Sequence, residues 1–596
     1  MLNWFKKRWN FTQGENDNGR DTGALTDSLT IENLFITASE HATHGDIDSA
    51  EKYCKEILKI ERWHPETHQL LAEIESAQGN YQAAIHHLEA AVHHHREPAE
   101  IYFRLGSYYQ KIGQFDEALD CYRISTHYGP DRGQAFLEMG NLYKQNGEID
   151  QAIQCYKKTI ELDPSSAAAY ALLGSLYHTH RQLDEALFNY REAVRLKPDF
   201  ADVWNNIGNV LLATEQYRQA LEPLKTAATL QPNSSKTRLN LGCAYRHLGE
   251  FESAHDEFEF VLRKEPNHFD ATWFRSHLWL ASEEWEKGWS AYEARFHAEG
   301  VLTFRALPYA PWKGEEPLDG KTLLVFGEQG LGDEIMFASC LPDILAQAGH
   351  CIVDCNRRLL PLFRRSFPAA TVVGSDHEFT PSWLRDAPPI DYQIPIGSLP
   401  LHFRNKSSDF PSHKGYLRAD PQLVRNWQQK LAELGDGLKV GISWKGGTSQ
   451  TGIKNRSIPL SALIPILGKT RAKFICLQYG DCQSEIEQIE REFGIKIHYW
   501  REAIDDYDQT ASLVYTLDLV ITVCTAIVHL TGALGKPAWV LTPAVSEWRY
   551  LRTGETLPWY PSVKLFRQRK AGDWTSVINE VADSLDKFRV MLESCG

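Results

Sequence analysis

The chain has 596 residues, of which 43% are hydrophobic and 24% are charged. This is ordinary globular composition, and it excludes a mostly disordered, collagen-like or disulfide-framework chain. The 63 Lys and Arg residues against 78 Asp and Glu residues leave a formal net charge of −15. Such an acidic chain is a poor general binder of nucleic-acid backbones, although a local site for one small anion stays open.

Residues 1–30 are expected to form a flexible tail. Its start, Met1–Phe11, mixes aromatic and basic residues but lacks the apolar core and cleavage site of a signal peptide. It is either a frayed end or a segment that touches a membrane surface or a partner. The chain has no run of about 18 apolar residues, so no membrane span is expected. The 11 cysteines are scattered, which indicates reduced thiols in a cytoplasmic protein.

Residues 31–299 repeat with a period of 34 residues. Alanine stands at positions 50, 84, 118, 152, 186, 220 and 254, and Gly or Ala stands twelve residues before each of them. Two further columns are mainly aromatic, and proline closes the units at positions 130, 164, 198, 232 and 266. Small residues fit where two antiparallel helices pack closely, aromatic residues fill the space beside them, and proline ends the second helix. The pattern resembles about eight tetratricopeptide repeats, the last of them degenerate, which implies an α-solenoid.

Such an array is expected to bind an extended peptide or a partner protein in its groove. The asparagines predicted to line this groove, where they can bond a peptide backbone, are Asn141, Asn205, Asn206, Asn209 and Asn240. The alternative is a scaffold for self-association, and homo-oligomerisation stays open. The final unit contains Trp285–Phe296 and is rich in tryptophan, so we expect it to dock on the segment that follows.

After a linker at residues 300–320, the pattern changes to α/β. A first Rossmann-like unit is predicted over residues 321–420, a connecting helix over 421–436, a second such unit over 437–573 and a closing helix over 574–596. Strands are expected at residues 321–326, 351–354, 371–373, 392–394, 438–443, 473–477, 496–499, 517–522 and 538–541. One helix is expected at residues 334–347 and others at 461–467, 484–492, 510–516 and 526–534. Because ligands of such sheets bind beyond the carboxyl ends of the strands, the loops after the strands should carry the chemistry.

The first of these loops is glycine-rich. Gly330, Gly332, Asp333 and Glu334 follow the first strand, but their order fits neither the dinucleotide fingerprint nor the P-loop. Asp333 is expected at the cleft end of the strand, where it can act as a general base towards an acceptor hydroxyl. The alternative is an ordinary carboxylate in the first turn of a helix, where it favours the helix dipole.

Two loops of the second unit carry candidate anion ligands. Lys445 and Gly446 end its first strand, and Arg456 precedes a helix, so these cations can meet a phosphate unless they are solvated surface charges. Further on, Thr525 starts a helix whose open amides suit a phosphate. His529 lies one turn later and is either part of this site or a structural histidine.

A third segment, Asp506-Tyr-Asp508, has the form of a metal-binding D-x-D motif. It directly precedes a predicted helix, so helix capping is the preferred interpretation and no metal is predicted.

Six motifs in this order resemble two-domain glycosyltransferases of the GT-B type, akin to heptosyltransferases and to the O-linked N-acetylglucosamine transferase. They are GLGDEIMFA (330–338), ISWKGG (442–447), RSIPL (456–460), LQYGD (477–481), HLTGALGKPAW (529–539) and PWYPSVKLFRQ (558–568). The resemblance covers about residues 285–590. It implies two Rossmann-like units that face a cleft, inverting transfer, and no metal or other cofactor.

The resemblance also assigns roles. Asp333 becomes the base, and the acceptor side includes Gly330, Gly332 and Glu334. The donor nucleotide-sugar side comprises Lys445, Gly446, Arg456, Gln478, Cys524, Thr525, His529 and Gly532. Many relatives carry Asp where this chain has Cys524, and the loss of that charge suits a negatively charged sugar.

The chain also resembles bacterial repeat-fused enzymes that attach nonulosonic acids to flagellin. The leading hypothesis is therefore a protein O-glycosyltransferase that moves a pseudaminic or legionaminic acid from a CMP donor to Ser or Thr of a protein such as flagellin. Three alternatives stay open. They are a UDP-sugar-dependent protein transferase, an envelope-saccharide transferase, and a repeat scaffold whose transferase half is degenerate.

Overall fold

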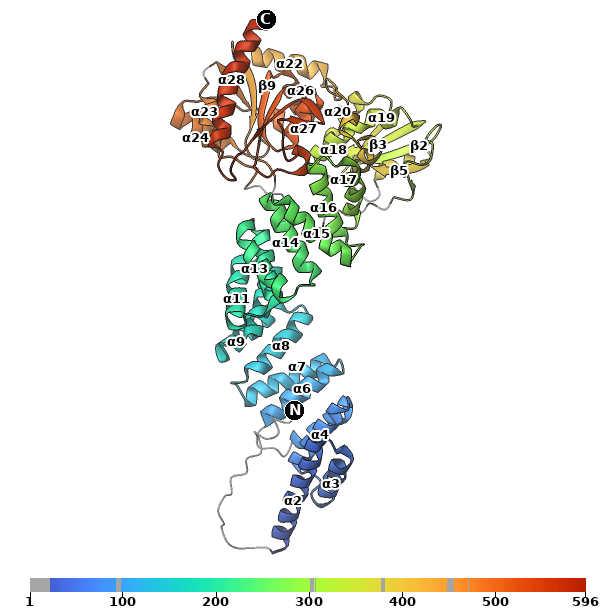
Figure 1. Cartoon of the computed structure of the whole chain (residues 1–596), viewed down its shortest axis with the longest axis vertical. Coiled ribbons are helices and arrows are strands. Elements are labelled where there is room, and N and C mark those ends of the chain that lie inside the picture. Colours follow the sequence, from blue (N-terminus) through green and yellow to red (C-terminus); the bar gives the residue numbers. More distant parts are fainter. Residues whose placement is uncertain are drawn as a thin grey trace. The chain divides into compact units, whose positions relative to one another are not determined.

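The computed structural model describes residues 22–92, 98–300, 305, 307–376, 381–447, 455–469 and 471–595 (Figure 1). The chain divides into two compact units, residues 1–210 and residues 211–596. The aromatic and basic segment Met1–Phe11 lies outside the described residues. No helix in the described ranges is long and apolar enough to span a membrane.

The described elements of the first unit are helices. Those that begin in it are α2 (Thr22–His44), α3 (Ile47–Ile60), α4 (Pro65–Ala77), α5 (Tyr81–Val92), α6 (Pro98–Lys111), α7 (Phe115–Tyr128), α8 (Gly133–Gln145), α9 (Ile149–Leu162), α10 (Ala167–Thr179), α11 (Leu183–Leu196) and α12 (Ala201–Ala213). Helix α2 begins at Thr22, so the prediction of a tail up to residue 30 was wrong for its last nine residues. Neither Gly nor Pro interrupts the sequence between Ala24 and Ile31, and the helix therefore extends further towards the N-terminus than the repeat pattern.

The small-residue column packs as the 34-residue period predicted. A Cβ atom built on Gly140 of α8 would lie 2.5 Å from the ring of Tyr156 of α9. The same overlap, at 2.5–2.8 Å, is found for Gly106 with Tyr122, Gly174 with Tyr190 and Gly242 with Phe258. Glycine is therefore required where a large ring of the second helix reaches the backbone of the first.

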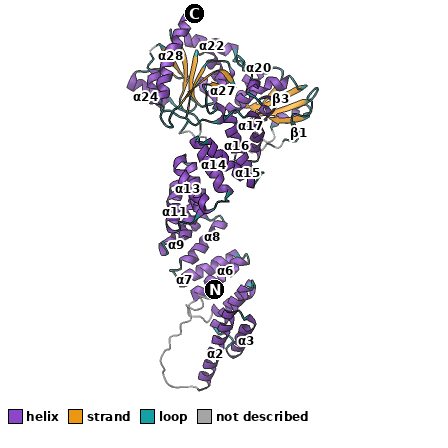
Figure 2. Ribbon diagram, viewed as in Figure 1, coloured by secondary structure: helices purple, strands orange, loops and turns teal. Residues whose placement is uncertain are grey.

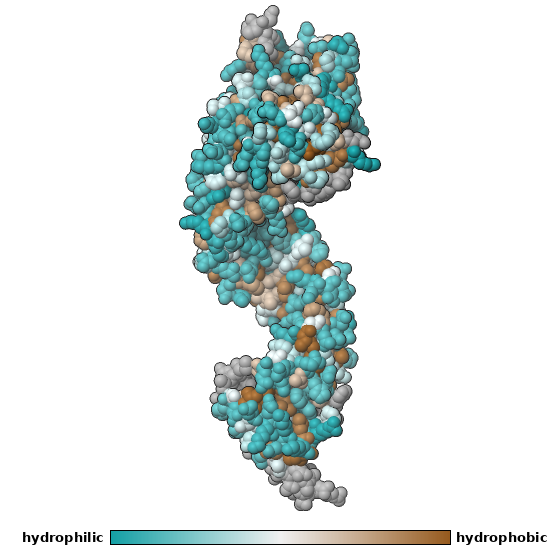
Figure 3. Space-filling view, turned by 90° about the vertical axis from the view of Figure 1, so that its right-hand side faces the viewer, coloured by the Kyte–Doolittle hydropathy of each residue, from teal (hydrophilic) through white to brown (hydrophobic). Residues whose placement is uncertain are grey.

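The second unit begins with the remaining repeat helices. These are α13 (Tyr217–Leu230), α14 (Ser235–Leu248), α15 (Phe251–Lys264), α16 (Phe269–Ala281) and α17 (Trp285–Tyr292). Two sheets follow, which Figure 2 shows as two separate groups of strands. On the face of the molecule in Figure 3, hydrophilic residues predominate, in keeping with a net charge of −15.

The first sheet is parallel, with strand order β1-β5-β2-β3-β4. Its strands are β1 (Ala310–Pro311), β2 (Thr322–Phe326), β3 (His350–Asn356), β4 (Thr371–Ser375) and β5 (Tyr392–Pro395). Strand β1 lies in the segment that was predicted to be a linker. The prediction is corrected, because residues 310–311 pair with β5 and Trp312 is buried. The first α/β unit therefore begins about ten residues earlier than expected.

The second sheet has seven strands, in the order β11-β12-β10-β9-β6-β7-β8, and only β11 runs antiparallel to its neighbour. Its strands are β6 (Leu438–Ser443), β7 (Ala472–Cys476), β8 (Ile497–His498), β9 (Leu519–Val523), β10 (Ala538–Thr542), β11 (Thr556–Leu557) and β12 (Tyr560–Arg567). The prediction missed β11 and β12. Pro558 separates the two strands and Pro561 lies within β12, and proline is tolerated in strands only where an amide is not needed.

Helices follow the strands; most of them are short, and the last, α28, has 21 residues and comes after β12. They are α18 (Leu331–Phe337), α19 (Leu341–Leu345), α20 (Leu360–Ser366), α21 (Leu399–Phe403), α22 (Pro421–Ala432), α23 (Ile464–Leu467), α24 (Gln483–Phe493), α25 (Glu502–Asp505), α26 (Tyr507–Thr516), α27 (Ala526–Ala533) and α28 (Thr575–Cys595). The single helix expected at residues 334–347 is instead α18, a 3-10 turn and α19. Pro342 explains the break, because it cannot donate the backbone hydrogen bond that a continuous helix needs there.

The last repeat is part of the core of the second unit. Trp289 of α17 is buried and donates from Nε1 to the carbonyl oxygen of Arg404 at 2.9 Å. Its ring packs edge to face on Trp548 and Trp559, with centroids 5.5 and 6.0 Å apart. The predicted docking of the tryptophan-rich repeat on the following segment is thereby confirmed.

Candidate functional site

The candidate residues lie where the connections of each sheet change direction. In the second sheet, β6 and β9 are neighbours, and the chain leaves β6 towards β7 but leaves β9 towards β10. In the first sheet, β2 lies between β5 and β3 in the same way. Crevices open beyond the carboxyl ends of strands at such points, because the following helices lie on opposite faces. The loops after β2, β6 and β9 therefore share the geometry of ligand sites.

The loops after β2 and β9 meet. Gly330 caps α18, and its carbonyl oxygen accepts from the amides of Asp333 and Glu334. A Cβ atom built on Gly332 would lie 3.1 Å from Cδ2 of His529 and 3.2 Å from Cα of Ala526. The glycine thus lets the start of α18 touch the first turn of α27, although the two motifs are almost 200 residues apart.

Asp333 forms an ion pair that sequence reasoning missed. Nε of Arg549 donates to Oδ1 of Asp333 at 2.5 Å, and the two side chains are only 19% and 20% exposed. The guanidinium also lies 4.6 Å from the ring centroid of Trp548. Burial is the largest influence on Arg549 and opposes its charged form, but Asp333, Tyr292 and Glu547 together outweigh it, so the pKa of Arg549 is raised. No motif or spacing pointed to Arg549, which lies in a loop between β10 and β11.

The loops after β6 and β9 also meet. A Cβ atom on Gly446 would lie 2.8 Å from the carbonyl oxygen of Cys524 and 3.0 Å from that of Arg456. Thr525 caps α27 by accepting from the amide of Ile527. The side chain of Arg456 lies 3.7 Å from Glu547. Gly446, Arg456, Cys524 and Thr525 are therefore neighbours, and their role in donor binding stays a prediction.

Two buried groups at this place carry no charge near neutral pH. Burial raises the pKa of the Cys524 thiol to about 12. Burial, reinforced by Arg549 and Arg456, lowers the pKa of His529 to about 3, and Nδ1 of this histidine lies 3.2 Å from the hydroxyl of Tyr560. The charged groups near them include the guanidinium groups of Arg456, Arg549 and Arg567 and the carboxylates of Asp333 and Glu547.

Four predicted residues have other partners. Nζ of Lys445 pairs with Glu485 rather than facing a cleft alone. The amide of Gln478 is buried and accepts from the backbone N–H groups of Trp444 and Lys445, so it shapes the loop. Gly532 packs against Tyr560, whose Cγ would lie 2.3 Å from a Cβ atom there.

Glu334 is the fourth of these residues. It is fully buried, and its carboxylate accepts from the amide of Asn356 at 2.9 Å. Its position on the acceptor side of a cleft is corrected, because the carboxylate ties the glycine-rich turn to the end of β3.

The D-x-D segment caps a helix, as the preferred interpretation held. Asp506 is the N-cap of α26 and accepts from the amide of Asp508 at 2.8 Å. Asp508 forms an ion pair with Arg365 of α20. The helix begins at Tyr507, three residues earlier than expected.

The predicted groove asparagines have mixed environments. Asn141 accepts from the hydroxyl of Tyr156 at 2.9 Å and donates to Glu138, and Asn206 bonds Tyr190. Asn209 and Asn240 are half-buried. Asn205 is only 3% exposed, so its prediction as a groove residue is corrected. The remaining four asparagines are at least partly accessible.

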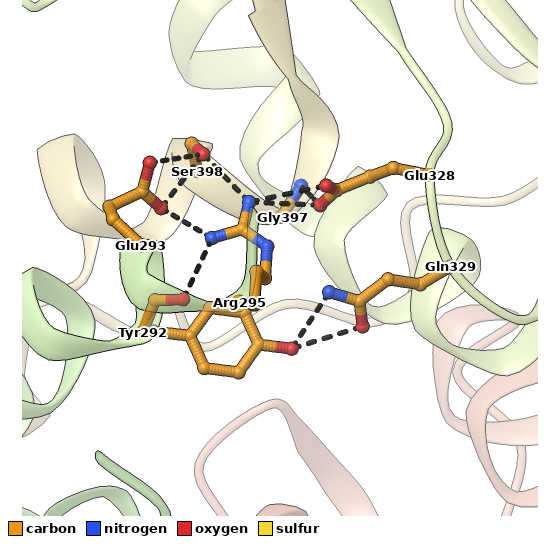
Figure 4. A network of polar contacts seen from close by, with 7 residues as sticks. All are labelled: Tyr292, Glu293, Arg295, Glu328, Gln329, Gly397 and Ser398. Atoms are coloured by element: carbon orange, nitrogen blue, oxygen red, sulfur yellow. Dashed lines mark hydrogen bonds and ion pairs between the residues drawn. The ribbon is translucent and has the colours of Figure 1, made fainter. Parts of the chain in front are cut away.

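A buried arginine joins the last repeat to the glycine-rich turn (Figure 4). Arg295 is fully buried and pairs with Glu293 at 2.5 Å and with Glu328 at 3.0 Å. Tyr292 hydrogen-bonds Gln329 at 3.0 Å, and Glu328 accepts from the amide of Gly397. Glu328 and Gln329 lie in the turn that leads to Asp333, so the last repeat holds this turn in place.

Comparison with known proteins identifies the helical part. Models described as "TPR repeat" and "Tetratricopeptide repeat" match residues 70–133, 140–180, 182–214, 201–234 and 239–301. Among curated proteins, Protein FlbA of Caulobacter vibrioides is 36% identical over 359 residues, which are 57% of this chain. The chain spans 59% of the length of that protein.

Solved structures similar to this chain include MamA and YrrB. A MamA structure is 26% identical and covers 27% of this chain and 95% of its own, with a TM-score of 0.26. YrrB, described as a TPR protein with an unusual peptide-binding site, is 25% identical and covers 30% of this chain and 91% of its own, with a TM-score of 0.28. On the family matches and the packing of its helix pairs, the helical part of this chain is an array of tetratricopeptide repeats.

Proposed function

We propose that the chain is an inverting protein O-glycosyltransferase of the GT-B type that acts in the cytoplasm and receives its acceptor protein through the repeats. The observation that carries the proposal is the contact between the start of α18, which presents Asp333, and the first turn of α27. A carboxylate that follows a strand of one sheet and a helix start that follows a strand of the other suit a base and a phosphate ligand in a transfer between two substrates. Tetratricopeptide repeats generally bind peptides, which suits a protein acceptor.

The residues have the following roles in this reaction. Asp333 takes the proton from a Ser or Thr hydroxyl as its oxygen attacks the anomeric carbon of the sugar. The bond between the sugar and the donor phosphate breaks, and its electron pair leaves with the phosphate. Arg456 and the amides of the first turn of α27 stabilise that developing charge. Lys445 contributes only if it leaves Glu485.

The donor we propose is a CMP-linked nonulosonic acid, such as pseudaminic or legionaminic acid, and the acceptor is a protein such as flagellin. The support for the donor is local. Cys524 is neutral and buried, and the cation of Arg456 lies near it. A carboxylated sugar would meet a neutral thiol there, with the carboxylate of Glu547 also close by and paired with Arg456.

Nucleotide binding tests the donor first. The thermal unfolding midpoint is measured with CMP, UDP, GDP and ADP at millimolar concentration. Binding at 100 times the dissociation constant stabilises the folded state by about 2.7 kcal/mol, which shifts the midpoint measurably. We expect a selective shift with CMP, whereas a selective shift with UDP moves the proposal to a hexose or hexosamine donor.

Transfer by an Asp333→Ala variant tests the base. We expect the variant to lose transfer to the acceptor protein, by about 100-fold or more as is typical for removal of a general base, while it still binds nucleotide. Asp343→Asn, which removes a carboxylate that faces the buried Arg404, is the matched control and should keep its activity. Transfer by Asp333→Ala at the wild-type rate contradicts the role of Asp333.

One observation favours a second candidate, a repeat scaffold with an inactive transferase half. Asp333 and Lys445 are both engaged in ion pairs within the chain. A protein that binds none of the four nucleotides, by calorimetry as well as by thermal unfolding, fits this candidate better than the enzyme.

A further inference from the structure

Asp333, the proposed base, is paired with Arg549 in this structure. The two side chains come from different sheets, since Asp333 follows β2 and Arg549 follows β10. Oδ1 of Asp333 accepts the Nε hydrogen of Arg549 at 2.5 Å in a mostly buried environment. Arg549 thereby occupies Oδ1 of Asp333, an oxygen that a substrate hydroxyl would otherwise reach. The pair has to loosen before this oxygen is open to the hydroxyl.

The surroundings of Arg549 suit an anion. Burial is the main reason why His529 is neutral. The positive charges of Arg549 and Arg456 lower the pKa of this histidine further. Cys524 is a neutral thiol. Thr525 caps the first turn of α27, and the ring centroid of His529 in this helix lies 6.1 Å from that of Tyr550, the residue next to Arg549. Asp333 and Glu547 are the carboxylates that the structure places against the two arginines.

A carboxylate of the chain held by a mostly buried arginine has the chemistry of a bound oxyanion. We propose that Arg549 binds an oxyanion of the donor, and that Asp333 occupies the guanidinium group while the donor is absent. Arrival of the donor then transfers Arg549 to the ligand and frees Asp333 to act as the base. This inference rests on the proposed function and adds an order to it, with donor before acceptor. The oxyanion comes either from the donor phosphate or from a carboxylate on its sugar.

The test is a double-mutant cycle on the full chain. Dissociation constants for CMP, CMP-N-acetylneuraminic acid and inorganic pyrophosphate are measured by calorimetry. The proteins are the wild type, Asp333→Asn, Arg549→Met and the double variant. Asp333→Asn removes the competing carboxylate but keeps its shape, so it should bind the ligands at least about fivefold more tightly, the lower end of a typical coupling between sites. Arg549→Met should weaken binding by at least about fivefold. The double variant should bind the ligands no more tightly than Arg549→Met alone.

The control and the ligands separate the explanations. Asp343→Asn removes the partner of another buried arginine, Arg404, and should leave all three constants unchanged. If the effects appear with CMP and pyrophosphate, the oxyanion is the phosphate. If they appear only with CMP-N-acetylneuraminic acid, it is the sugar carboxylate. If Arg549→Met does not fold, the dissociation constants of Arg549→Lys and Asp333→Asn test the inference.

Two results overturn the inference. One is an Asp333→Asn variant that binds no ligand more tightly than the wild type does. The other is a folded Arg549 variant that binds as the wild type does. If the dissociation constant for CMP is the same in the wild type and in both variants, this inference is contradicted, whereas the proposed function is not. Pyrophosphate binding that follows both substitutions, without binding of CMP or CMP-sugar, supports the anion site and contradicts the proposed CMP donor.

Discussion

His529 illustrates how the surroundings of a residue decide its chemistry. From sequence it was either a ligand at a helix start or a structural histidine. The structure packs it between Gly332 and Tyr560, where burial and two arginines hold its pKa at about 3. A histidine with this pKa stays uncharged during catalysis near neutral pH, so it is suited to shape the site and unsuited to shuttle protons.

The pH dependence of stability follows from this pKa. The unfolded histidine has a pKa of about 6.5, so its contribution to stability is complete above that value. It is lost as pH falls from about 6.5 towards 3, because the unfolded state binds the proton first. At pH 5 we expect a loss of about 2 kcal/mol from this group alone.

Thermal or urea unfolding of the wild type and of His529→Asn at pH 7 and pH 5 measures this loss. His529→Asn should be the less pH-sensitive of the two. His297→Asn, on the exposed end of the last repeat, is the control and should follow the wild-type profile. Equal pH sensitivity of His529→Asn and the wild type contradicts the burial of a neutral His529.

At the scale of the element, the helix pairs obey rules that can be read along the chain. The turn between the two helices of a repeat needs a left-handed residue every 34 positions. Glycine supplies it at positions 45, 79, 113, 147 and 249, with φ between 78° and 84°. Arg181, Glu215 and Glu283 adopt the same conformation at equivalent positions, with φ between 60° and 62°. Repeat packing therefore imposes a backbone conformation that these side chains disfavour.

Helix α8 offers a matched pair of glycines for testing the packing rule. A Cβ atom on Gly140 would meet the ring of Tyr156 at 2.5 Å, whereas its nearest neighbour at Gly133 would be 3.6 Å away. Gly140→Ala should destabilise the first unit by about 1–3 kcal/mol through overpacking. Gly133→Ala should be neutral or stabilising by up to about 1 kcal/mol, because alanine favours a helix. Urea unfolding followed by circular dichroism gives both values.

A second substitution tests whether the ring causes the cost. Earlier repeats of this chain combine Ala38 with Cys54 and Ala72 with Leu88 at the same two positions. Gly140→Ala together with Tyr156→Leu should therefore be more stable than the sum of the two single changes predicts. Strict additivity of the two free energies rules out the contact as the cause.

At the scale of the whole molecule, the boundary between compact units does not coincide with the boundary between repeats and sheets. Residues 211–596 hold the last repeats together with both sheets. Trp289 of the last repeat is 1% exposed, and it contacts the rings of Trp548 and Trp559. The final repeat is thus a structural part of the unit that holds both sheets as well as the end of the array.

Two deletions separate these roles. A chain that starts at Phe200 keeps α12 whole and should fold, bind nucleotide and lose transfer to a protein acceptor. A chain that lacks residues 31–299 also loses Trp289, whose removal alone costs about 3–5 kcal/mol at a buried site. We expect this second chain to aggregate or to unfold at a much lower temperature, as measured by scanning calorimetry and light scattering. Equal thermal midpoints for the two deletions contradict the structural role of the last repeat.

The repeat array and most strands were predictable because their signals are local. The 34-residue period predicts the helix pairs, and an apolar run such as Leu438–Ser443 predicts a buried strand. Each signal lies within a short stretch of sequence and does not depend on distant segments. Strand β12 was not predicted, and Pro561 within it departs from the usual composition of a strand. The edge strand β1 escaped for a similar reason, since two residues carry no period.

The candidate site divides in the same way. The sequence by itself determined that the repeats pair their helices and that Gly330–Asp333 and Thr525–His529 follow buried strands. Only the tertiary structure decided that these loops touch, that Lys445 faces Glu485 and that Asp333 faces Arg549, 216 residues away. Helix periods repeat along the chain and are visible in it. The pairing of two buried charges depends on which distant segments the fold brings together. No regular spacing of residues in the sequence indicates such a pair.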